Sequence, residues 1–399
     1  MTSPVPPVGD RRWLYLFVGL GATLVACSFQ YGLGYLLPTL RAEGLTLPQA
    51  GLLVSAPIAG TTCGLVVAGL SADRHGERWV LAVGLAASGI ALLGAAAVEG
   101  LAARGALLVV AGAFAASAQA TSGRLVLRFP TGRRGIAMGI RQTAQPLGIV
   151  AAALLVPAAA EAGGSGRAFT GLGVACLVAA LGTALFLRDG PPAPMERAAP
   201  PGESLYATPF LWRVHVASAL LIVPQFTVAA FSFDYLVTAR DWSNATAGVL
   251  LGGAQFAGAA ARLGAGAWSD RLGLRLLPMR RLAVCAAVVL ALLGAAAAAG
   301  VPVVVTLLVA AAAVTVSTNG LSNTAVTERA GPGAAGRVMG TQNTAQNLVA
   351  AATPPAVGSL IAAAGAGAGG YAAAFGVAAL ASVLAVPTIP AGQEEADLR

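Results

Sequence analysis

Two short stretches of sequence decide the fold: Gly69-Leu70-Ser71-Ala72-Asp73-Arg74-His75-Gly76-Glu77-Arg78 and Gly266-Ala267-Trp268-Ser269-Asp270-Arg271-Leu272-Gly273-Leu274-Arg275. Glycine, aspartate, arginine, glycine and arginine occupy the same relative positions in both, at an offset of 197 residues. Each stretch follows one long apolar run and precedes another. The repeat indicates that the chain of 399 residues consists of two related halves.

A second repeat supports this division. Its offset is 201 residues throughout, and it pairs Arg128, Gly132, Gly135, Met138, Gly139 and Thr143-Ala144-Gln145 with Arg329, Gly333, Gly336, Met339, Gly340 and Thr344-Ala345-Gln346. Two independent repeats at nearly the same offset are typical of a duplicated chain.

The composition excludes an ordinary soluble domain. Hydrophobic residues make up 57% of the chain and charged residues only 10%, with a mean hydropathy of +0.77, whereas soluble domains carry about 25% charged residues. The net charge of +8 comes from arginines scattered between apolar runs. Because they form no basic face, we expect no nucleic-acid partner.

Twelve apolar runs are long enough to cross a bilayer, which takes about 20 residues of helix. They lie near residues 13–37, 48–70, 79–98, 104–127, 136–159, 168–187, 212–237, 245–267, 281–300, 303–325, 338–361 and 369–389. We number them spans 1 to 12. The predicted fold class is an all-α, polytopic membrane protein with membrane lipid as its main surroundings.

The segment between spans 6 and 7 is rich in proline and glycine, so it predicts a linker between two six-helix bundles. The predicted organisation is a tail at 1–12, bundles at 13–187 and 212–389, a linker at 188–211 and a tail at 390–399. Placing both termini inside leaves 17 arginines on the inner side, three within spans and four outside, namely Arg41, Arg104, Arg167 and Arg240. The positive-inside rule therefore predicts cytoplasmic termini. The absence of lysine and the excess of alanine and glycine are typical of a GC-rich bacterial genome, so the expected location is the bacterial inner membrane.

The two opening stretches resemble the G-x-x-x-D-R-x-G-x-[RK] loop signature of the major facilitator superfamily. Both copies stand where a six-plus-six chain of that family carries them, and the resemblance covers nearly the whole chain. It implies two pseudo-symmetric bundles related by an axis along the membrane normal. It also implies a secondary active transporter that moves a small solute by alternating access, usually as a monomer.

The resemblance assigns the signature a gating role. The predicted gating residues are Gly69, Asp73, Arg74, Gly76, Arg78, Gly266, Asp270, Arg271, Gly273, Arg275, Arg133, Arg134 and Arg337. We expect Asp73 to approach Arg337, and Asp270 to approach Arg133 and Arg134, as latches between the halves. The glycines would allow tight turns and close helix approach. The alternative is that these charges only set the topology.

Polar side chains concentrate in eight spans, whereas spans 3, 6, 9 and 12 are expected to be supporting helices. The candidate solute-binding residues with amide or phenol groups are Gln30, Tyr31, Gln119, Gln145, Gln255, Asn319, Asn323, Gln342 and Gln346. In span 10, five polar residues from Thr315 to Asn323 follow a helical spacing and predict one continuous polar stripe. The alternative for such groups is that they only join helices together.

Charge within the spans favours an anion. Arg124, Arg141 and Arg262 stand against one acid, Asp234, and buried ionisable residues in membranes are candidate functional groups. Arg262 is predicted to lie deep, whereas the other two could instead snorkel to the inner surface. Asp234 is the candidate for proton coupling, with a hydrogen bond at the helix end as its alternative role.

The segment from Arg262 to Arg271 is similar to the eighth helix of monocarboxylate, oxalate and nitrate or cyanate carriers of this superfamily. The similarity implies that Arg262 contacts an anion. Many monocarboxylate carriers have an aspartate one turn earlier, where this chain has Gly258. Proton coupling by that route is therefore not expected here.

Three other functions compete with anion transport. An exporter of drugs or natural products, working by proton antiport, is the main alternative, although the arginine and Gly-Pro signatures of such exporters are absent or weak here. A transport-like sensor is a remote alternative. An enzyme is not expected, because no catalytic cluster can be assembled. No metal or cofactor is expected either: Cys27, Cys63, Cys176, Cys285, His75 and His215 form no ligand motif.

Overall fold

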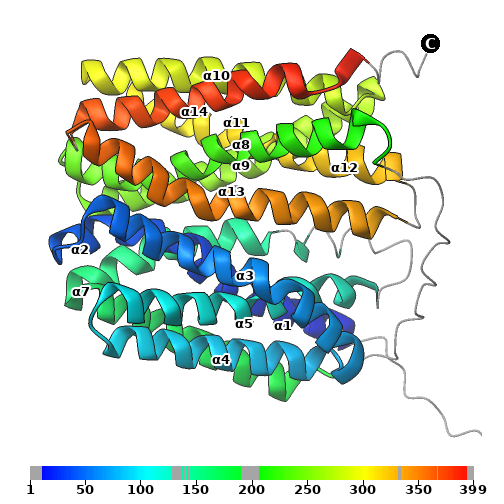
Figure 1. Ribbon diagram of the computed structural model, residues 1–399. Coiled ribbons are helices and arrows are strands. Elements are labelled where there is room, and N and C mark those ends of the chain that lie inside the picture. The colour runs from blue at the N-terminus through cyan, green and yellow to red at the C-terminus, as the bar shows by residue number, and fades with distance from the viewer. Residues whose placement is uncertain are drawn as a thin grey trace, which may run out of the picture. The chain divides into compact units, whose positions relative to one another are not determined.

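The computed structural model describes residues 11–127, 137, 140, 141, 143–189, 206–330, 334–365 and 367–392, and the side chains of Asp73 and Arg124 lie outside that description. The regular structure of the described residues is entirely helical (Figure 1). Its elements are α1 (Arg11–Gly32), η1 (Leu33–Leu36), α2 (Leu37–Ala42), α3 (Leu47–His75), α4 (Glu77–Ala97), α5 (Leu101–Leu127), α7 (Ala144–Phe186), α8 (Pro209–Asp234), η2 (Tyr235–Ala239), α9 (Asn244–Leu272), α10 (Leu276–Ala299), α11 (Val304–Val316), α12 (Thr318–Ala330), α13 (Ala335–Ala363) and α14 (Ala368–Thr388). The predicted all-α fold is confirmed.

Nine helices within the described residues are long and apolar enough to cross a membrane by length and composition. The difference from twelve has two causes. Span 6 and the part of span 5 from Ala144 onward are counted together as α7, although non-helical backbone at Gly163 and Gly164 divides α7 into two helices. Spans 8 and 11, which form α9 and α13, carry several charged and amide residues and are not among the nine. These two polar helices are therefore candidates to face the solute.

Span 10 is not the single helix that its spacing predicts. It divides into α11 and α12 at Ser317, whose N–H bonds to the carbonyl of Val314, three residues earlier. The predicted polar stripe therefore starts at Thr315 in α11 and continues in α12 after a break. Such a break changes the direction of the backbone carbonyls next to it.

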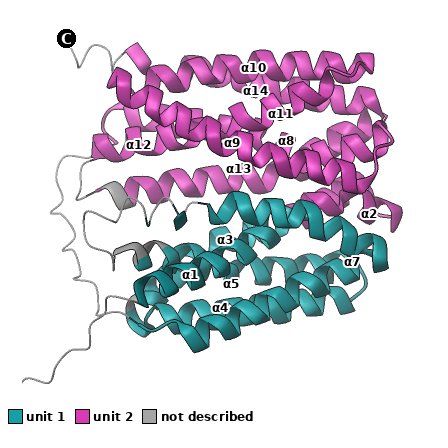
Figure 2. Ribbon diagram, turned by 180° about the vertical axis from the view of Figure 1, so that it is seen from behind, with its two compact units in different colours: residues 1–33, 56–194 teal, residues 34–55, 195–399 magenta. Residues whose placement is uncertain are grey.

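Two compact units make up the chain (Figure 2). Unit 1 contains residues 1–33 and 56–194, and unit 2 contains residues 34–55 and 195–399. The second unit thus includes a segment, 34–55, that the predicted division at the 188–211 linker assigns to the first bundle. That segment holds α2, which packs against α8.

Small residues bring helices of unit 1 together. Within it α1 packs against α7, and α4 packs against both α5 and α7. A Cβ added at Gly60 would lie 1.9 Å from the carbonyl oxygen of Val109, and one at Gly64 would lie 2.0 Å from that of Ala113. Only glycine lets α3 and α5 approach so closely, as at many contacts between membrane helices.

In unit 2, α8 packs against α11, α13 and α14, while α10 packs against α14 and α11 (Figure 1). Buried apolar residues of α8, α10, α12 and α14, among them Leu211, Val214, Met279 and Val326, form a common core. Helix α10 buries one side against this core and exposes Val284, Val288 and Leu292 on the other side, as expected for a helix beside lipid.

The sequence suggested that the repeated signature forms a loop, but most of its residues lie on helices. Residues 69–75 form the last turns of α3, and residues 266–272 form those of α9. The turns are made by Gly76 (φ 82°) and Gly273 (φ 66°), in a left-handed region that favours glycine. Gly69 and Gly266 do not serve the expected close approach, since no described atom lies within 4 Å of a Cβ built there.

Candidate functional site

A small polar cavity of about 170 Å³ lies in unit 1. Four residues predicted to bind solute line it, and three further residues complete the lining: Tyr31, Gln119, Arg141 and Gln145, with Thr23, Cys27 and Ala144. The chain folds to this arrangement because α1, the second half of α5 and the start of α7 pack together through close-fitting glycines, such as Gly148 against the Leu24 carbonyl. None of the residues that line the cavity is acidic.

Arg141 supplies the charge of this cavity. Its Nε and Nη2 donate to Ser122 Oγ at 3.1 and 3.0 Å, and the residue is half-buried. Of the two roles that the sequence left open for Arg141, lining a cavity therefore agrees with its position. The side chain of Arg124, the other candidate of that pair, lies outside the described part of the structure.

A chain of hydrogen bonds runs behind the cavity. Gln119 Nε2 donates to Gln30 Oε1 at 2.9 Å, and Gln30 Nε2 donates to Thr61 Oγ1 at 2.8 Å. Thr61 is buried and was not among the predicted residues. These bonds fix the orientation of both amides, so the Gln119 side chain is held at the cavity wall.

Unit 2 contains its own polar network at the meeting of α8, α12 and α13. Gln342 Nε2 donates to Asn323 Oδ1 at 2.6 Å and lies 3.2 Å from Ser322 Oγ, while its Oε1 lies 3.1 Å from His215 Nδ1. Gln342 is fully buried. Asn319 donates to Gln225 Oε1 at 2.8 Å. Most of the predicted polar stripe of span 10 therefore contacts other helices of the same unit.

Arg262 lies at the break in span 10. Its Nε donates to the carbonyl oxygen of Val316 at 3.2 Å. That carbonyl belongs to the last residue of α11, where the helix ends and carbonyl groups lack helical partners. Gln255 is two turns earlier on α9, and both side chains are half-buried.

Asp234 belongs to a buried ion pair that the sequence did not predict. Arg41 Nη1 lies 3.1 Å from Asp234 Oδ2, and Tyr371 donates a short hydrogen bond to the same oxygen. Thr238 contacts both Arg41 and Tyr371 through its hydroxyl, at 3.2 and 3.0 Å. Asp234 is 0% exposed. Of its two predicted roles, the hydrogen bond at the helix end agrees with this geometry, although the carboxylate is fully buried. Span 12, expected to be a support, contributes Tyr371.

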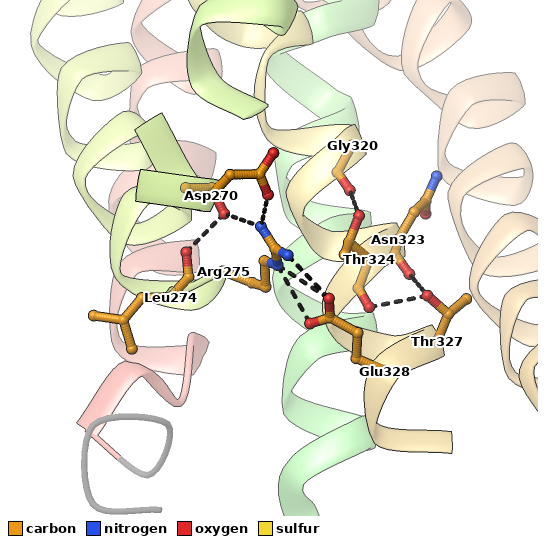
Figure 3. A network of polar contacts seen from close by, with 9 residues as sticks. Asp270, Leu274, Arg275, Gly320, Asn323, Thr324, Thr327 and Glu328 are labelled. Atoms are coloured by element: carbon orange, nitrogen blue, oxygen red, sulfur yellow. Dashed lines mark hydrogen bonds and ion pairs between the residues drawn. The ribbon is translucent and has the colours of Figure 1, made fainter. Parts of the chain in front are cut away.

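The second signature copy forms a charged cluster at the ends of α9 and α12 (Figure 3). Arg275 donates to Glu328 Oε1 from Nη2 at 3.1 Å and also pairs closely with Asp270. The hydrogen bonds to Glu328 and Asp270 raise the pKa of the Arg275 guanidinium above its ordinary value. Asp270 therefore already has an ion-pair partner, Arg275, inside unit 2.

Arg78, the matching arginine of the first copy, donates from Nε to the carbonyl of Ala184 at 2.9 Å, and its N–H bonds to Asp189 Oδ1 at 2.8 Å. Arg74, Arg271 and Arg337 are exposed. Arg133 and Arg134 lie outside the described residues, and so does the Asp73 side chain. Both predicted latches therefore stay predictions.

Gln346 is buried, and its Nε2 has no hydrogen-bond partner among the described residues. Cys27, Cys63, Cys176 and Cys285 are free thiols. The described part of the chain contains no group of three His, Cys, Asp or Glu side chains arranged to hold a metal ion.

Residues 19–354 match the family model described as the Major Facilitator Superfamily. An uncharacterized MFS-type transporter of Mycobacterium tuberculosis is 41% identical over 393 residues, which cover 96% of this chain and 86% of the relative. Among solved structures, a bacterial homolog of the human lysosomal transporter Spinster, in an inward-facing and occupied conformation, matches with a TM-score of 0.76 at 15% identity, over 96% of this chain and 97% of the other. A mutant of the nucleoside transporter NupG matches with a TM-score of 0.71 at 17% identity, over 93% and 98%.

Proposed function

This chain belongs to the major facilitator superfamily, and we propose that it carries a small organic or inorganic anion. It is a multi-pass membrane transporter of a small-molecule solute, from a family that is not enzymatic. The proposed cycle is alternating access between the two six-helix halves. The proposed setting is the bacterial inner membrane, with cytoplasmic termini and a monomeric protein.

The observation that carries the anion proposal is the cavity around Arg141. A guanidinium presents a planar fork of N–H donors that matches carboxylate, nitrate or phosphate oxygens. Tyr31, Gln119 and Gln145 add further donors around the same space. With an arginine and no acid in the lining, an anionic solute gains charge compensation that a cation would not.

Arg262 is the candidate second anchor, in unit 2. Its bond to the Val316 carbonyl uses Nε. A guanidinium presents five N–H donors in a planar fork that matches carboxylate, nitrate or phosphate oxygens. Gln255, Gln342, Gln346, Asn319 and Asn323 are candidate neighbours of the solute from the same unit. Arg124 remains a candidate on the basis of the sequence.

The size of the cavity favours a small solute over the exporter alternative. Pockets for drug-sized ligands enclose roughly 300–1,000 Å³ and are mostly apolar. The Arg141 cavity has about 170 Å³. This volume suits an anion of a few heavy atoms. A bulky natural product would need a larger, more apolar space, such as the pocket of about 550 Å³ lined by Val67, Trp79 and Phe114, which contains no arginine.

The gating proposal retains both latches, Asp73 with Arg337 and Asp270 with Arg133 and Arg134. For Asp270 the latch competes with Arg275, its partner inside unit 2. Asp73→Ala is expected to change the transport rate and the balance of conformations; unchanged values of both would remove the latch. Asp234 stays a candidate for proton coupling, although its bond to Arg41 opposes protonation, because a proton on the carboxylate would cost that ion pair.

The test is stabilisation of the purified protein by a panel of organic and inorganic anions, since a ligand that binds the folded state raises the apparent melting temperature. We expect at least one small anion to stabilise the parent protein. Arg141→Gln should abolish the shift and Arg262→Gln should reduce it.

Arg167→Gln is the matched control, because Arg167 is exposed and does not line the Arg141 cavity. This variant should keep the full shift. Stabilisation by bulky neutral or cationic compounds alone, equal in the parent and Arg141→Gln, would favour the exporter.

A further inference from the structure

His215 lies in the second turn of α8 and is 4% exposed, yet both nitrogens of its ring have polar partners. Nδ1 lies 3.1 Å from Gln342 Oε1, and Nε2 lies 3.3 Å from the hydroxyl oxygen of Tyr206. No role was predicted for this histidine from the sequence. A buried ionisable group at membrane depth is costly to keep, which makes it a candidate functional group.

The direction of the hydrogen bonds determines which nitrogen can titrate. Gln342 Nε2 is directed to Asn323 Oδ1 and Ser322 Oγ, so its carbonyl oxygen faces the histidine. That oxygen can only accept, which requires a proton on Nδ1 of His215. Nε2 is then the nitrogen that gains or loses a proton.

The Tyr206 hydroxyl suits both forms of the ring. It can donate to Nε2 of the neutral imidazole, and after a rotation about its C–O bond it can accept from the N–H of the imidazolium. Both hydrogen bonds of His215 therefore persist when the proton arrives or leaves. The ring gains or loses one positive charge while both of its nitrogens stay hydrogen-bonded.

The charged side chains on the surrounding elements have other described partners or face outward. Arg213 of α8 donates to the carbonyls of Pro387 and Thr388, the last two residues of α14. Arg329 of α12 lies over the ring of Phe210. The remaining charged or titratable groups on the helices that pack against α8 are Arg41 on α2, Arg262, Asp270 and Arg271 on α9, Arg280, Arg281 and Cys285 on α10, Glu328 on α12, Arg337 on α13, Tyr371 on α14 and Tyr235 on η2. Among the described residues, no carboxylate bonds to the ring, so no fixed negative charge holds the proton there.

The polar line continues from His215 along two antiparallel helices. Gln342 of α13 meets Ser322 of α12, and the next positions in that register are Gln346 and Thr318. Both are buried, and Gln346 Nε2 and Thr318 Oγ1 have no hydrogen-bond partner among the described residues. Two unpaired polar atoms one turn further along extend the polar path beyond the Gln342 rung.

We propose that His215 is a proton-binding site of this transporter and that the proton is its coupling ion. In this step the lone pair of Nε2 takes a proton from water, the Tyr206 hydroxyl turns from donor to acceptor, and the ring becomes a cation; release reverses the step. Asp234 is less suited, because its carboxylate is already paired with Arg41. The coupling role rests on the proposed transport function, whereas proton binding does not.

The fluorescence of Trp212 tests proton binding directly. Its indole packs edge-on against the His215 ring with centroids 6.5 Å apart, and an imidazolium quenches a neighbouring indole more strongly than a neutral imidazole does. Replacing Trp13, Trp79, Trp242 and Trp268 by phenylalanine leaves Trp212 as the only tryptophan. We expect its emission to fall in one transition as the pH decreases between 8 and 5, where an imidazole titrates.

His215→Asn should abolish the transition, and Tyr206→Phe should keep it. If the fourfold variant does not fold, the difference titration between the parent and His215→Asn, with all tryptophans present, gives the same comparison. The proposal would be overturned if the Trp212 emission of the protein with His215 stays constant from pH 8 to 5. It would also be overturned if the transition persists when His215→Asn is added to the same protein.

Transport separates the two proposals. In proteoliposomes loaded with a pH gradient, His215→Asn should lose gradient-driven accumulation of the solute and keep exchange without a gradient. A fluorescence transition in a protein that exchanges no anion would support the proton-binding site and contradict the proposal that the solute is an anion. Anion exchange with equal gradient-driven accumulation in the parent and His215→Asn would contradict proton coupling at His215.

Discussion

Arg41 donates from Nη1 to both carboxylate oxygens of Asp234, at 3.2 and 3.1 Å, within unit 2. The acid is 0% exposed and the arginine side chain 25% exposed. The pair joins the short helix that follows span 1 to the end of span 7, immediately before the π-helical turn of η2. The acid predicted within the spans is therefore matched by an arginine that the sequence assigned to an outer loop.

Removing Arg41 alone should destabilise the protein more than removing both partners. Arg41→Ala leaves the buried Asp234 carboxylate without its cation, and breaking such pairs costs about 3 kcal/mol, less here because Arg41 is partly exposed. Unfolding in detergent measures the change. The double variant Arg41→Ala/Asp234→Asn should recover part of the loss; a double variant as unstable as the sum of the singles would contradict a coupled pair.

Tyr371→Phe should lower the free energy of unfolding by about 1.5–3 kcal/mol, because it removes one hydrogen bond to a buried carboxylate. Tyr35→Phe is the matched control. Tyr35 is also buried in unit 2, and its ring packs edge-on against Phe233 with centroids 5.3 Å apart, a contact that phenylalanine keeps. Equal losses in both variants would show that the Tyr371 hydroxyl contributes nothing specific.

Two glycines of α3 should respond oppositely to alanine. Gly64→Ala places a Cβ 2.0 Å from the Ala113 carbonyl oxygen, and such overpacking costs about 1–3 kcal/mol. Gly69→Ala meets no described atom within 4 Å and should be neutral or stabilising, since alanine favours a helix over glycine by about 1 kcal/mol. Thermal stability in detergent measures both, and a loss at Gly69 equal to that at Gly64 would refute the packing argument.

The Arg275 cluster should be sensitive to salt and insensitive to ordinary changes in pH. Its partners Asp270 and Glu328 are exposed, at 70% and 54%, so Glu328→Gln should cost less than about 1 kcal/mol, and the difference should shrink at high salt. The raised pKa of Arg275 means that its contribution is complete below its unfolded pKa and is lost only as the pH rises through the higher folded value.

Both of those pKa values lie far above pH 9. The difference in melting temperature between the parent and Glu328→Gln should therefore not decrease because Arg275 loses its charge between pH 6 and 9. A difference that grows with salt would exclude an ion pair as its cause.

The helices were predictable because a bilayer demands long apolar runs with internally bonded backbones. The ends were less so, although the non-helical backbone at Gly163 and Gly164 separates spans 5 and 6 where the sequence predicts a gap. Ser317 divides span 10, although nothing in its local pattern differs from a helix. Breaks of this kind depend on which neighbour donates a hydrogen bond to the freed carbonyl, as Arg262 does to Val316.

The candidate site was predictable where residues share one helix face and hidden where they meet across helices. Arg141 and Gln145 follow from the spacing of polar residues on one face of span 5, and they line one cavity with Tyr31 and Gln119 of other spans. Arg41 lies 193 residues before its partner, so no local pattern joins them. The need of a buried acid for a cation at the same depth was the one available signal.

The most direct measurement is exchange of a radiolabelled small anion, chosen as the best stabiliser in the panel, by the protein in liposomes. The account predicts that the parent and Arg167→Gln exchange it, that Arg141→Gln loses at least tenfold in rate, and that an uncharged analogue of equal size is not exchanged. Exchange of the neutral analogue at the same rate as the anion, or full exchange by Arg141→Gln, would contradict an anion carrier anchored at Arg141.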